Sequence, residues 1–227
     1  MDVAWARRQF PVTERMVFLN NAAESPLSLP VRRRLDKYLD LAAWSPDKRP
    51  PARHPLRPLL SRLLGGAPEE YALVTSTGVG LGLAAAGYAW APGDNVVVPA
   101  DEHWNNTFPW LALRARGVDV RLVPLNVDGD GIDVLACAGF KWLLGLHGTG
   151  FVYVRKGVWD RIQPVLPGMF AAEDNLHELL WLPNAQRYET GSLAYSLFYA
   201  WTAGQCRVSP AFYNTEEEID RLLDALG

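Results

Sequence analysis

Short apolar segments alternate with helical ones along the middle of this chain, and this rhythm constrains the fold more than any other feature. Five runs have the length and composition of buried strands: 71–75, 95–99, 118–124, 132–136 and 151–154. Two longer segments, 79–89 and 107–116, have the composition of helices. Strands that alternate with helices build a parallel sheet covered on both faces. We therefore predict an α/β fold with a mostly parallel sheet and helices on both faces.

Further helices and strands are expected before and after this alternating region. A Pro- and Arg-rich loop leads into a helix at 57–64 that stops at Gly65-Gly66. Helices are also expected at 157–163 and 192–202, with a short strand at 207–209. The segment 215–226 is predicted to be an amphipathic helix, because Thr215 can cap it and acidic residues fill its first turn.

Composition narrows the kinds of protein this can be. The 227 residues allow one large domain or one domain with a small appendage, and the 49% hydrophobic content is enough for a core. With a net charge of −3 and no basic stripe, we expect neither a nucleic-acid nor a membrane partner. Cys137 and Cys206 lie in apolar runs and are expected to be small buried hydrophobes. The start of the chain has no long apolar segment, so we expect a cytoplasmic protein.

The turn at 75–80, Thr-Ser-Thr-Gly-Val-Gly, joins a predicted strand to a predicted helix. A helix N-terminus offers unpaired N–H groups and a positive dipole end, and small or hydroxyl residues let an anion approach. The turn lacks the lysine of a Walker loop and the third glycine of a dinucleotide fingerprint. It is either a phosphate site or a tight strand–helix turn without a ligand.

Lys141 follows a predicted buried strand and Gly139. Lysine is rarely buried without a purpose, and a lysine in apolar surroundings is a competent amine for Schiff-base chemistry. The alternative is a lysine whose stem extends along the end of the strand to reach solvent.

Two other side chains are candidates for function. His103 follows the second strand and could stack on an aromatic ligand or move protons, or could be a hydrogen-bonded loop histidine. Arg207 could bind a carboxylate through two hydrogen bonds, or form a structural salt bridge. His54, His147 and His177 have no supporting pattern and are expected to be structural or exposed. No metal site is predicted, because the calcium-like start at 126–131 lacks its final Glu.

Six segments, in order, resemble the class V aminotransferase family, which includes cysteine desulfurases and isopenicillin-N-epimerase-like proteins. They are Phe18-Leu-Asn-Asn-Ala-Ala23, the turn at 75–80, Glu102-His103, Ala138-Gly-Phe-Lys141 with Gly148-Thr-Gly-Phe-Val-Tyr153, Arg187-Tyr-Glu-Thr-Gly-Ser192, and the run that begins at Cys206-Arg207. The lysine and C-terminal segments are the most specific of the six.

The resemblance implies the fold type I of pyridoxal 5′-phosphate (PLP) enzymes, with PLP as cofactor and Lys141 as its Schiff-base residue. It implies that His103 stacks on the pyridine ring, so that Lys141 and His103 are the catalytic residues. Thr77 and Gly78 are implied to contact the phosphate, and Ser192 to reach the phosphate of a second subunit in a homodimer.

The resemblance also implies where an amino-acid substrate binds and how the chain is divided. Arg207 is implied to bind the substrate carboxylate, and Asn21 and Ala22 to lie in the substrate loop. The large PLP-binding domain is expected at 16–203. Segments of the small domain are expected at 1–15 and 204–227.

The sequence departs from the family in three respects. Two strand–helix units of the family are missing between Gly131 and Ile132, and with them the Asp that pairs with the pyridine nitrogen on a strand ending in Asp-x-x-Gln. Most of the small C-terminal domain is missing between Gly204 and Cys206. Ala138 replaces a serine that contacts phosphate.

Two main hypotheses therefore remain. The first is a PLP-dependent enzyme of aminotransferase, lyase or epimerase type. The second is a catalytically impaired or non-catalytic remnant of that family. A phosphate-binding α/β domain without PLP is a third, supported only by the turn at 75–80. Desulfuration is the least expected chemistry, because neither cysteine occupies the position of the family's nucleophile.

Overall fold

The computed structural model describes residues 2–50, 56–100, 102–124, 132–141, 143–173 and 180–204. The chain divides into two compact units. The first comprises Met1–Leu59, Gly139–Thr149 and Ala194–Gly227, and the second comprises Leu60–Ala138 and Gly150–Leu193. The predicted strand at 207–209, the predicted helix at 215–226 and Arg207 lie outside the described residues.

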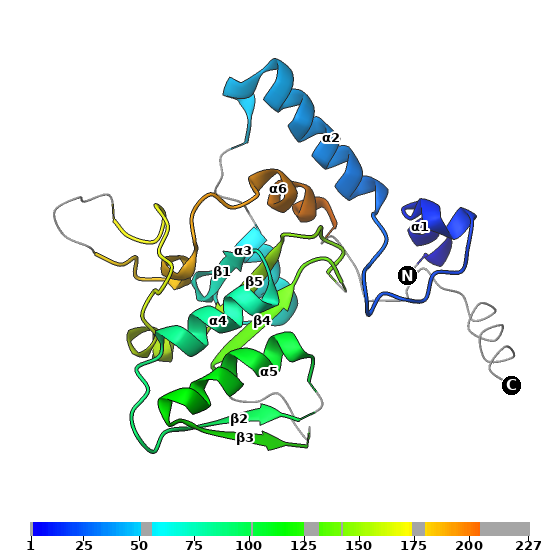
Figure 1. Cartoon of the computed structure of the whole chain (residues 1–227). Helices are drawn as coiled ribbons and strands as arrows, with labels where there is room; N and C mark the ends of the chain where they lie inside the picture. The colour runs from blue at the N-terminus through cyan, green and yellow to red at the C-terminus, as the bar shows by residue number, and fades with distance from the viewer. Residues whose placement is uncertain are drawn as a thin grey trace, which may run out of the picture. The chain divides into compact units, whose positions relative to one another are not determined.

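The elements of the chain are labelled in Figure 1. The α-helices are α1 (Val3–Arg8), α2 (Leu29–Trp44), α3 (Leu56–Leu64), α4 (Thr77–Gly87), α5 (Trp104–Leu111) and α6 (Tyr195–Gly204). The strands are β1 (Tyr71–Val74), β2 (Asn95–Pro99), β3 (Asp119–Val123), β4 (Val134–Ala138) and β5 (Gly150–Val154). Short 3-10 helices are η1 (Pro11–Glu14), η2 (Pro46–Lys48), η3 (Pro68–Glu70), η4 (Ala112–Arg116), η5 (Lys156–Arg161) and η6 (Ala185–Tyr188).

The first unit contains a helix pair that sequence analysis did not anticipate. The sixteen-residue α2 packs against α6, where the rings of Tyr38 and Tyr199 lie 5.9 Å apart. The guanidinium of Arg34 lies 4.3 Å from the centre of the Tyr199 ring, a cation–π contact. Trp201 on α6 is fully buried. Aromatic packing from α6 therefore holds α2, a largely exposed helix with four basic and two acidic side chains.

The second unit contains two small sheets. β2 and β3 pair in parallel, whereas β5 lies between β1 and β4 and pairs antiparallel with both. The α/β class is as predicted, but the prediction of mostly parallel pairing is wrong for β5. The chain returns from β4 to β5 through the loop 139–149 without a crossover helix, and such a connection gives antiparallel strands.

Helix α4 lies over the three-stranded sheet, and α5 lies beside β2 and β3 (Figure 1). A Cβ on Gly80 would come within 3.0 Å of Ala136 and 3.2 Å of Val152, so glycine lets α4 approach the sheet closely. A second cluster, with Ala85, Val98 and Leu113, fills the space between α4, α5 and the β2–β3 sheet. Both faces of α4 are therefore in the core, which explains its apolar sequence.

The segment around η6 covers the free edge of β1. Glu189 is buried, and its carboxylate accepts a hydrogen bond of 2.8 Å from the N–H of Leu73, which points away from β5. Tyr188 donates its hydroxyl toward the carbonyls of Trp159 (3.2 Å) and Ile162 (3.1 Å). An exposed strand edge is prone to unwanted pairing, and this segment protects it.

The hydroxyl of Tyr188 makes the fold sensitive to alkali. Burial raises the pKa of Tyr188 to about 12, whereas an unfolded tyrosine titrates near about 10. The unfolded state therefore loses this proton first, and this contribution to stability is complete below pH 10 and is lost as the pH rises toward 12. We expect the free energy of unfolding of the wild type, measured with urea, to fall steeply above pH 10. The free energy of unfolding of the Tyr188→Phe variant should fall less between pH 10 and 12. An equal fall in both proteins would contradict the assignment of this pH dependence to Tyr188.

Among the described residues, no helix is both long and apolar enough to cross a bilayer. The predicted helix at 107–116 begins earlier, at Trp104, and ends as η4 at Gly117, whose φ is +79°. The predicted strand at 132–136 begins two residues later, at Val134, and ends two residues later, at Ala138.

Candidate active site

The turn after β1 forms the open N-terminus of a helix. Ser76 caps α4, and its Oγ accepts a hydrogen bond of 3.2 Å from the N–H of Val79. The helix geometry leaves the N–H groups of Thr77 and Gly78 without an intrahelical acceptor. Among the described residues, a Cβ at Gly78 would meet only the Ser76 Oγ, at 4.0 Å, so the space beside Gly78 is open. Helix dipole, N–H groups and hydroxyls together suit a phosphate.

Strands β1 and β4 end at the same end of the three-stranded sheet, and a turn follows each of them. Val74, at the end of β1, and Ala138, at the end of β4, both pair with Gly150 on β5. A Cβ on Gly150 would lie 2.7 Å from the carbonyl of Cys137 and 3.2 Å from that of Val74, so glycine fits the narrow space between the carboxyl ends. The phosphate-type turn therefore begins at the same edge from which the chain continues toward Lys141.

Lys141 lies in the first unit, in a loop that many contacts fix. We call residues 139–149 the lysine loop. Its backbone closes on itself through hydrogen bonds from Gly145 to Gly139 (2.7 Å) and from Leu144 to Lys141 (3.0 Å). Leu144 is buried with a φ of +52°, a conformation that a non-glycine residue keeps only when its surroundings enforce it.

The lysine loop also packs tightly on α6. A Cβ on Gly139 would lie 3.0 Å from the Trp201 ring, as would a Cβ on Gly145. The indole Nε1 of Trp201 donates to the carbonyl of Leu143 at 2.8 Å. Lys141 itself is partly buried, whereas the other three lysines, Lys37, Lys48 and Lys156, are exposed. The loop therefore presents the chain's least exposed amine from a rigid base.

The predicted substrate loop lies against the lysine loop within the first unit. Asn21 is buried and Ala22 is exposed in the turn at 20–24. Ser25 donates two hydrogen bonds to the carbonyl of Phe140, from its N–H at 3.0 Å and from its Oγ at 2.9 Å. Sequence analysis missed Ser25, since no local pattern marks a contact between residues 115 positions apart.

His103 is exposed and caps α5 in the second unit. Its Nδ1 accepts a hydrogen bond of 3.1 Å from the N–H of Asn105, which fixes the ring and leaves Nε2 as the nitrogen that can face a ligand. The cap agrees with the plainer sequence alternative of a hydrogen-bonded loop histidine. Stacking on a cofactor ring stays a prediction.

Ser192 is exposed at the end of the segment that protects β1, with a φ of +46°. The preceding backbone at Thr190 and Gly191 packs on Gly168, where a Cβ would come within 2.0 Å of the Gly191 nitrogen. Of the predicted site residues, Thr77, Gly78, His103 and Ser192 thus belong to the second unit, and Lys141, Asn21 and Ala22 to the first.

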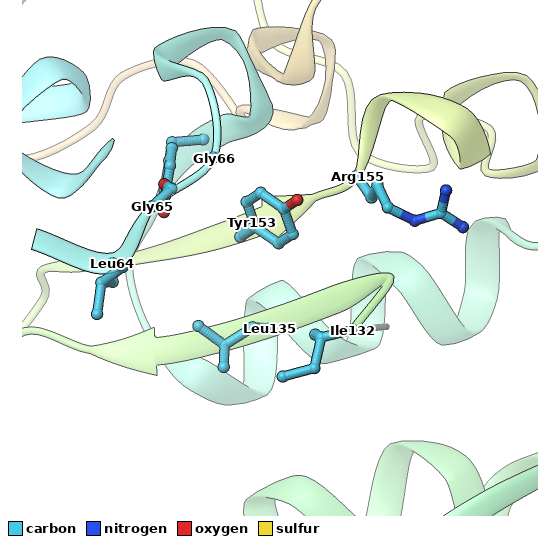
Figure 2. Close-up of a pocket in the computed structure, with 8 residues that line it drawn as sticks. Leu64, Gly65, Gly66, Ile132, Leu135, Tyr153 and Arg155 are labelled. Carbon is cyan, nitrogen blue, oxygen red and sulfur yellow. Dashed lines mark hydrogen bonds between the residues drawn. The ribbon is translucent and has the colours of Figure 1, made fainter. Parts of the chain in front are cut away.

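A cavity of about 380 Å³ lies elsewhere in the second unit (Figure 2). Leu135 and Tyr153 line it and alternate with Ala136 and Val152, which face α4, so the cavity is on the opposite face of the sheet. Arg155 at its rim is paired with Asp133. None of the predicted site residues that the structure describes lines it.

Comparison with known proteins gives one family. Residues 54–130 and 123–205 match Aminotransferase class-V. A probable cysteine desulfurase of Methanothermobacter thermautotrophicus is 32% identical over 131 residues, which are 54% of this chain and 33% of that protein. The chain spans about a quarter to a third of the length of the first curated relatives it matches.

Solved structures show the same fold at low identity. The apo cysteine desulfurase of Thermococcus onnurineus has a TM-score of 0.77 at 18% identity, over 98% of this chain and 76% of its own. A mutant of C-DES, whose structure has glycine linked covalently to its PLP cofactor, has a TM-score of 0.75 at 16% identity, over 88% of this chain and 72% of its own. The predicted fold class, a shortened fold type I domain, is confirmed.

Proposed function

The chain belongs to the class V aminotransferase family, and from this premise we propose that it is a PLP-dependent enzyme that acts on an amino acid through a Schiff base on Lys141. The observation that carries the proposal is the common edge of β1 and β4, where Val74 and Ala138 flank Gly150. A phosphate-type turn continues from one strand, and the lysine follows the other by three residues. The family resemblance assigns the phosphate of PLP to the turn and its aldehyde to the lysine.

The residues present fit the phosphate of PLP. The α4 N-terminus supplies N–H donors at Thr77 and Gly78 and a hydroxyl at Thr77, with open space beside Gly78. We assign these two residues to the phosphate. In a homodimer, Ser192 of the partner subunit would add a further donor, as the family resemblance implies.

The other roles follow the resemblance. PLP, when bound, supplies an electron sink for bond cleavage at the α-carbon of an amino acid. The Lys141 amine attaches the cofactor and afterwards holds or moves a proton at Nζ. His103 would lie on the ring face, with Nδ1 engaged by Asn105. Arg207 would bind the substrate carboxylate, and Asn21 and Ala22 would border the substrate.

We further propose a large domain at 16–203 with small-domain segments at 1–15 and 204–227, and a cytoplasmic homodimer. The substrate is an amino acid, and the reaction type is that of an aminotransferase, lyase or epimerase.

A second candidate function is a PLP-family remnant that binds cofactor but turns over slowly. The family match breaks at 123–130, next to the point where two strand–helix units are missing. The sequence spells Asp-x-x-Gln once, at Asp160 to Gln163, and there it belongs to η5 and the turn that follows, not to a strand end. No carboxylate of the described strands therefore corresponds to the pyridine-nitrogen Asp.

Titration with PLP tests the proposal. We expect wild-type protein to develop a Schiff-base absorption band, with competition by inorganic phosphate. Thr77→Val should weaken the apparent affinity for PLP by about tenfold, because one hydrogen bond to a charged group is lost. Thr77→Ser keeps the hydroxyl and should bind as wild type does.

The outcomes separate the two candidates. No band in the wild type would contradict both. A band without any conversion of amino acids would favour the remnant, and a band with conversion would favour the enzyme.

A further inference from the structure

Two segments far apart in the sequence are fastened together inside the first unit. The first is 20–25, which contains the predicted substrate loop, and the second is the lysine loop, 139–149. Within 20–25, the N–H groups of Ala23 (3.1 Å) and Glu24 (3.3 Å) both donate to the carbonyl of Asn20, which forms a compact turn. The turn leads directly into Ser25, which makes the main contact with the lysine loop.

Ser25 is buried and directs both of its donors at one acceptor. Its N–H and its Oγ donate to the carbonyl oxygen of Phe140 at 3.0 and 2.9 Å. That oxygen belongs to the peptide group that joins Phe140 to Lys141. Because a peptide group is planar, fixing its oxygen also fixes the N–H and Cα of the lysine. Ser25 therefore orients the backbone of Lys141 within the lysine loop.

A second contact connects the same two segments. The Nε2 of His147 lies 3.1 Å from the Oε1 of Glu24, and the His147 ring stacks on the Phe140 ring with 4.0 Å between their centres. Both side chains are 62% exposed, so the pair is a weak contact in solvent. It keeps the far end of the loop near the turn, while the Ser25 contact is the buried and stronger one.

We propose that Ser25 is a positioning residue for Lys141, which holds the Phe140–Lys141 peptide in the orientation needed for Schiff-base formation. The inference rests on the proposed function and deepens it. The Glu24–His147 contact assists by joining the substrate turn to the lysine loop, so that both move as one element. Ser25 itself contacts neither cofactor nor substrate in this assignment.

Ser28 offers a matched control for Ser25. It is also a buried serine, three residues further along, and its Oγ has no hydrogen-bond partner among the described residues. Ser28→Ala removes the same hydroxyl without removing a hydrogen bond. Ser25→Ala removes the Oγ bond but keeps the N–H bond to Phe140, so the fold should survive.

The test begins without PLP, by amide hydrogen exchange on the full chain. Exchange at Gly139, Leu144 and Gly145, whose N–H groups are bonded within the lysine loop, should be about fivefold faster in Ser25→Ala, the size expected for one lost hydrogen bond. Ser28→Ala should match the wild type. Unchanged exchange in Ser25→Ala would overturn the proposal.

The second stage separates positioning from general weakening. Pyridoxine 5′-phosphate has the phosphate of PLP but no aldehyde, so it reports the phosphate site alone. Ser25→Ala should bind it as the wild type does, while its rate of Schiff-base formation with PLP falls about fivefold. If the affinity for pyridoxine 5′-phosphate and the rate of Schiff-base formation fall by the same factor, the positioning role is overturned. If the wild type forms no Schiff base, the proposed function fails, and the exchange experiment still decides whether Ser25 orders the lysine loop.

Discussion

Lys141→Ala is expected to abolish the Schiff-base absorption that wild-type protein develops with PLP. The loss should be complete, not graded, because the band requires a covalent bond to an amine. The chain has only four lysines, and Lys141 is the one that is partly buried on a rigid loop. An exposed lysine amine is mobile, so it forms a Schiff base less readily than an amine held in one position.

The matched control for this loss is Lys37→Ala. Lys37 is exposed on α2, in the same unit as Lys141. Its replacement removes one lysine without touching the lysine loop, and it should leave the band unchanged. A band that persists in Lys141→Ala, or that disappears in Lys37→Ala, would contradict the assignment of the cofactor lysine. The same spectra recorded with pyridoxine 5′-phosphate should show no band in any variant.

Gly87→Ala is expected to lower the free energy of unfolding by about 3 kcal/mol. A Cβ at this position would lie 2.2 Å from the backbone carbonyl oxygen of Gln163, which no side-chain movement can relieve. The carbonyl oxygen of Gly87 also accepts a hydrogen bond of 2.7 Å from the N–H of Gln163. The end of α4 would have to move away from the segment after η5, and the shift would disturb the helix that carries the phosphate turn.

Gly82→Ala is the control, with the opposite sign. Gly82 lies in the middle of α4, and a Cβ there would meet nothing within 4 Å. Alanine is the better helix former, so unfolding should cost about 0.5–1 kcal/mol more. Urea denaturation of both variants measures the difference. Equal changes in the free energy of unfolding would show that the end of α4 does not pack closely against Gln163.

The sequence predicted elements whose signals are local. Five strands and the helices at 57–64, 79–89, 107–116 and 192–202 were identified because each has its own apolar pattern and turn residues. Gly65 and Gly66, with φ of +86° and +67°, end α3 where the glycine pair indicated. The helix α4 begins two residues before the prediction, at Thr77, because the Ser76 side chain already caps it.

What the sequence did not predict depends on distant partners. Nothing in the basic segment of α2 indicates that Tyr38 packs against Tyr199, more than a hundred residues away. Antiparallel pairing of β5 depends on whether the connection contains a crossover helix, and the glycine-rich lysine loop does not show this locally. His147 was expected to be structural or exposed, and it is exposed, but its contacts with Glu24 and Phe140 required the fold.

For the site, the family motifs identified the types of residue but not their support. Lys141 and the turn at 75–80 were recognised from sequence, whereas Ser25 and Trp201, which contact the lysine loop, were not. Both act through contacts with residues far away in the sequence, and a local sequence pattern does not encode such contacts. Arg207, the predicted substrate-carboxylate residue, lies outside the described residues and stays a prediction.

The most direct test of the central claim is to reduce the wild-type protein with borohydride in the presence of PLP, digest it and locate the modified lysine by mass spectrometry. With only four lysines in the chain, each can be assigned to a separate peptide. We expect a reduced PLP adduct on Lys141 alone. An adduct on Lys37, Lys48 or Lys156, or no adduct at all, would contradict it.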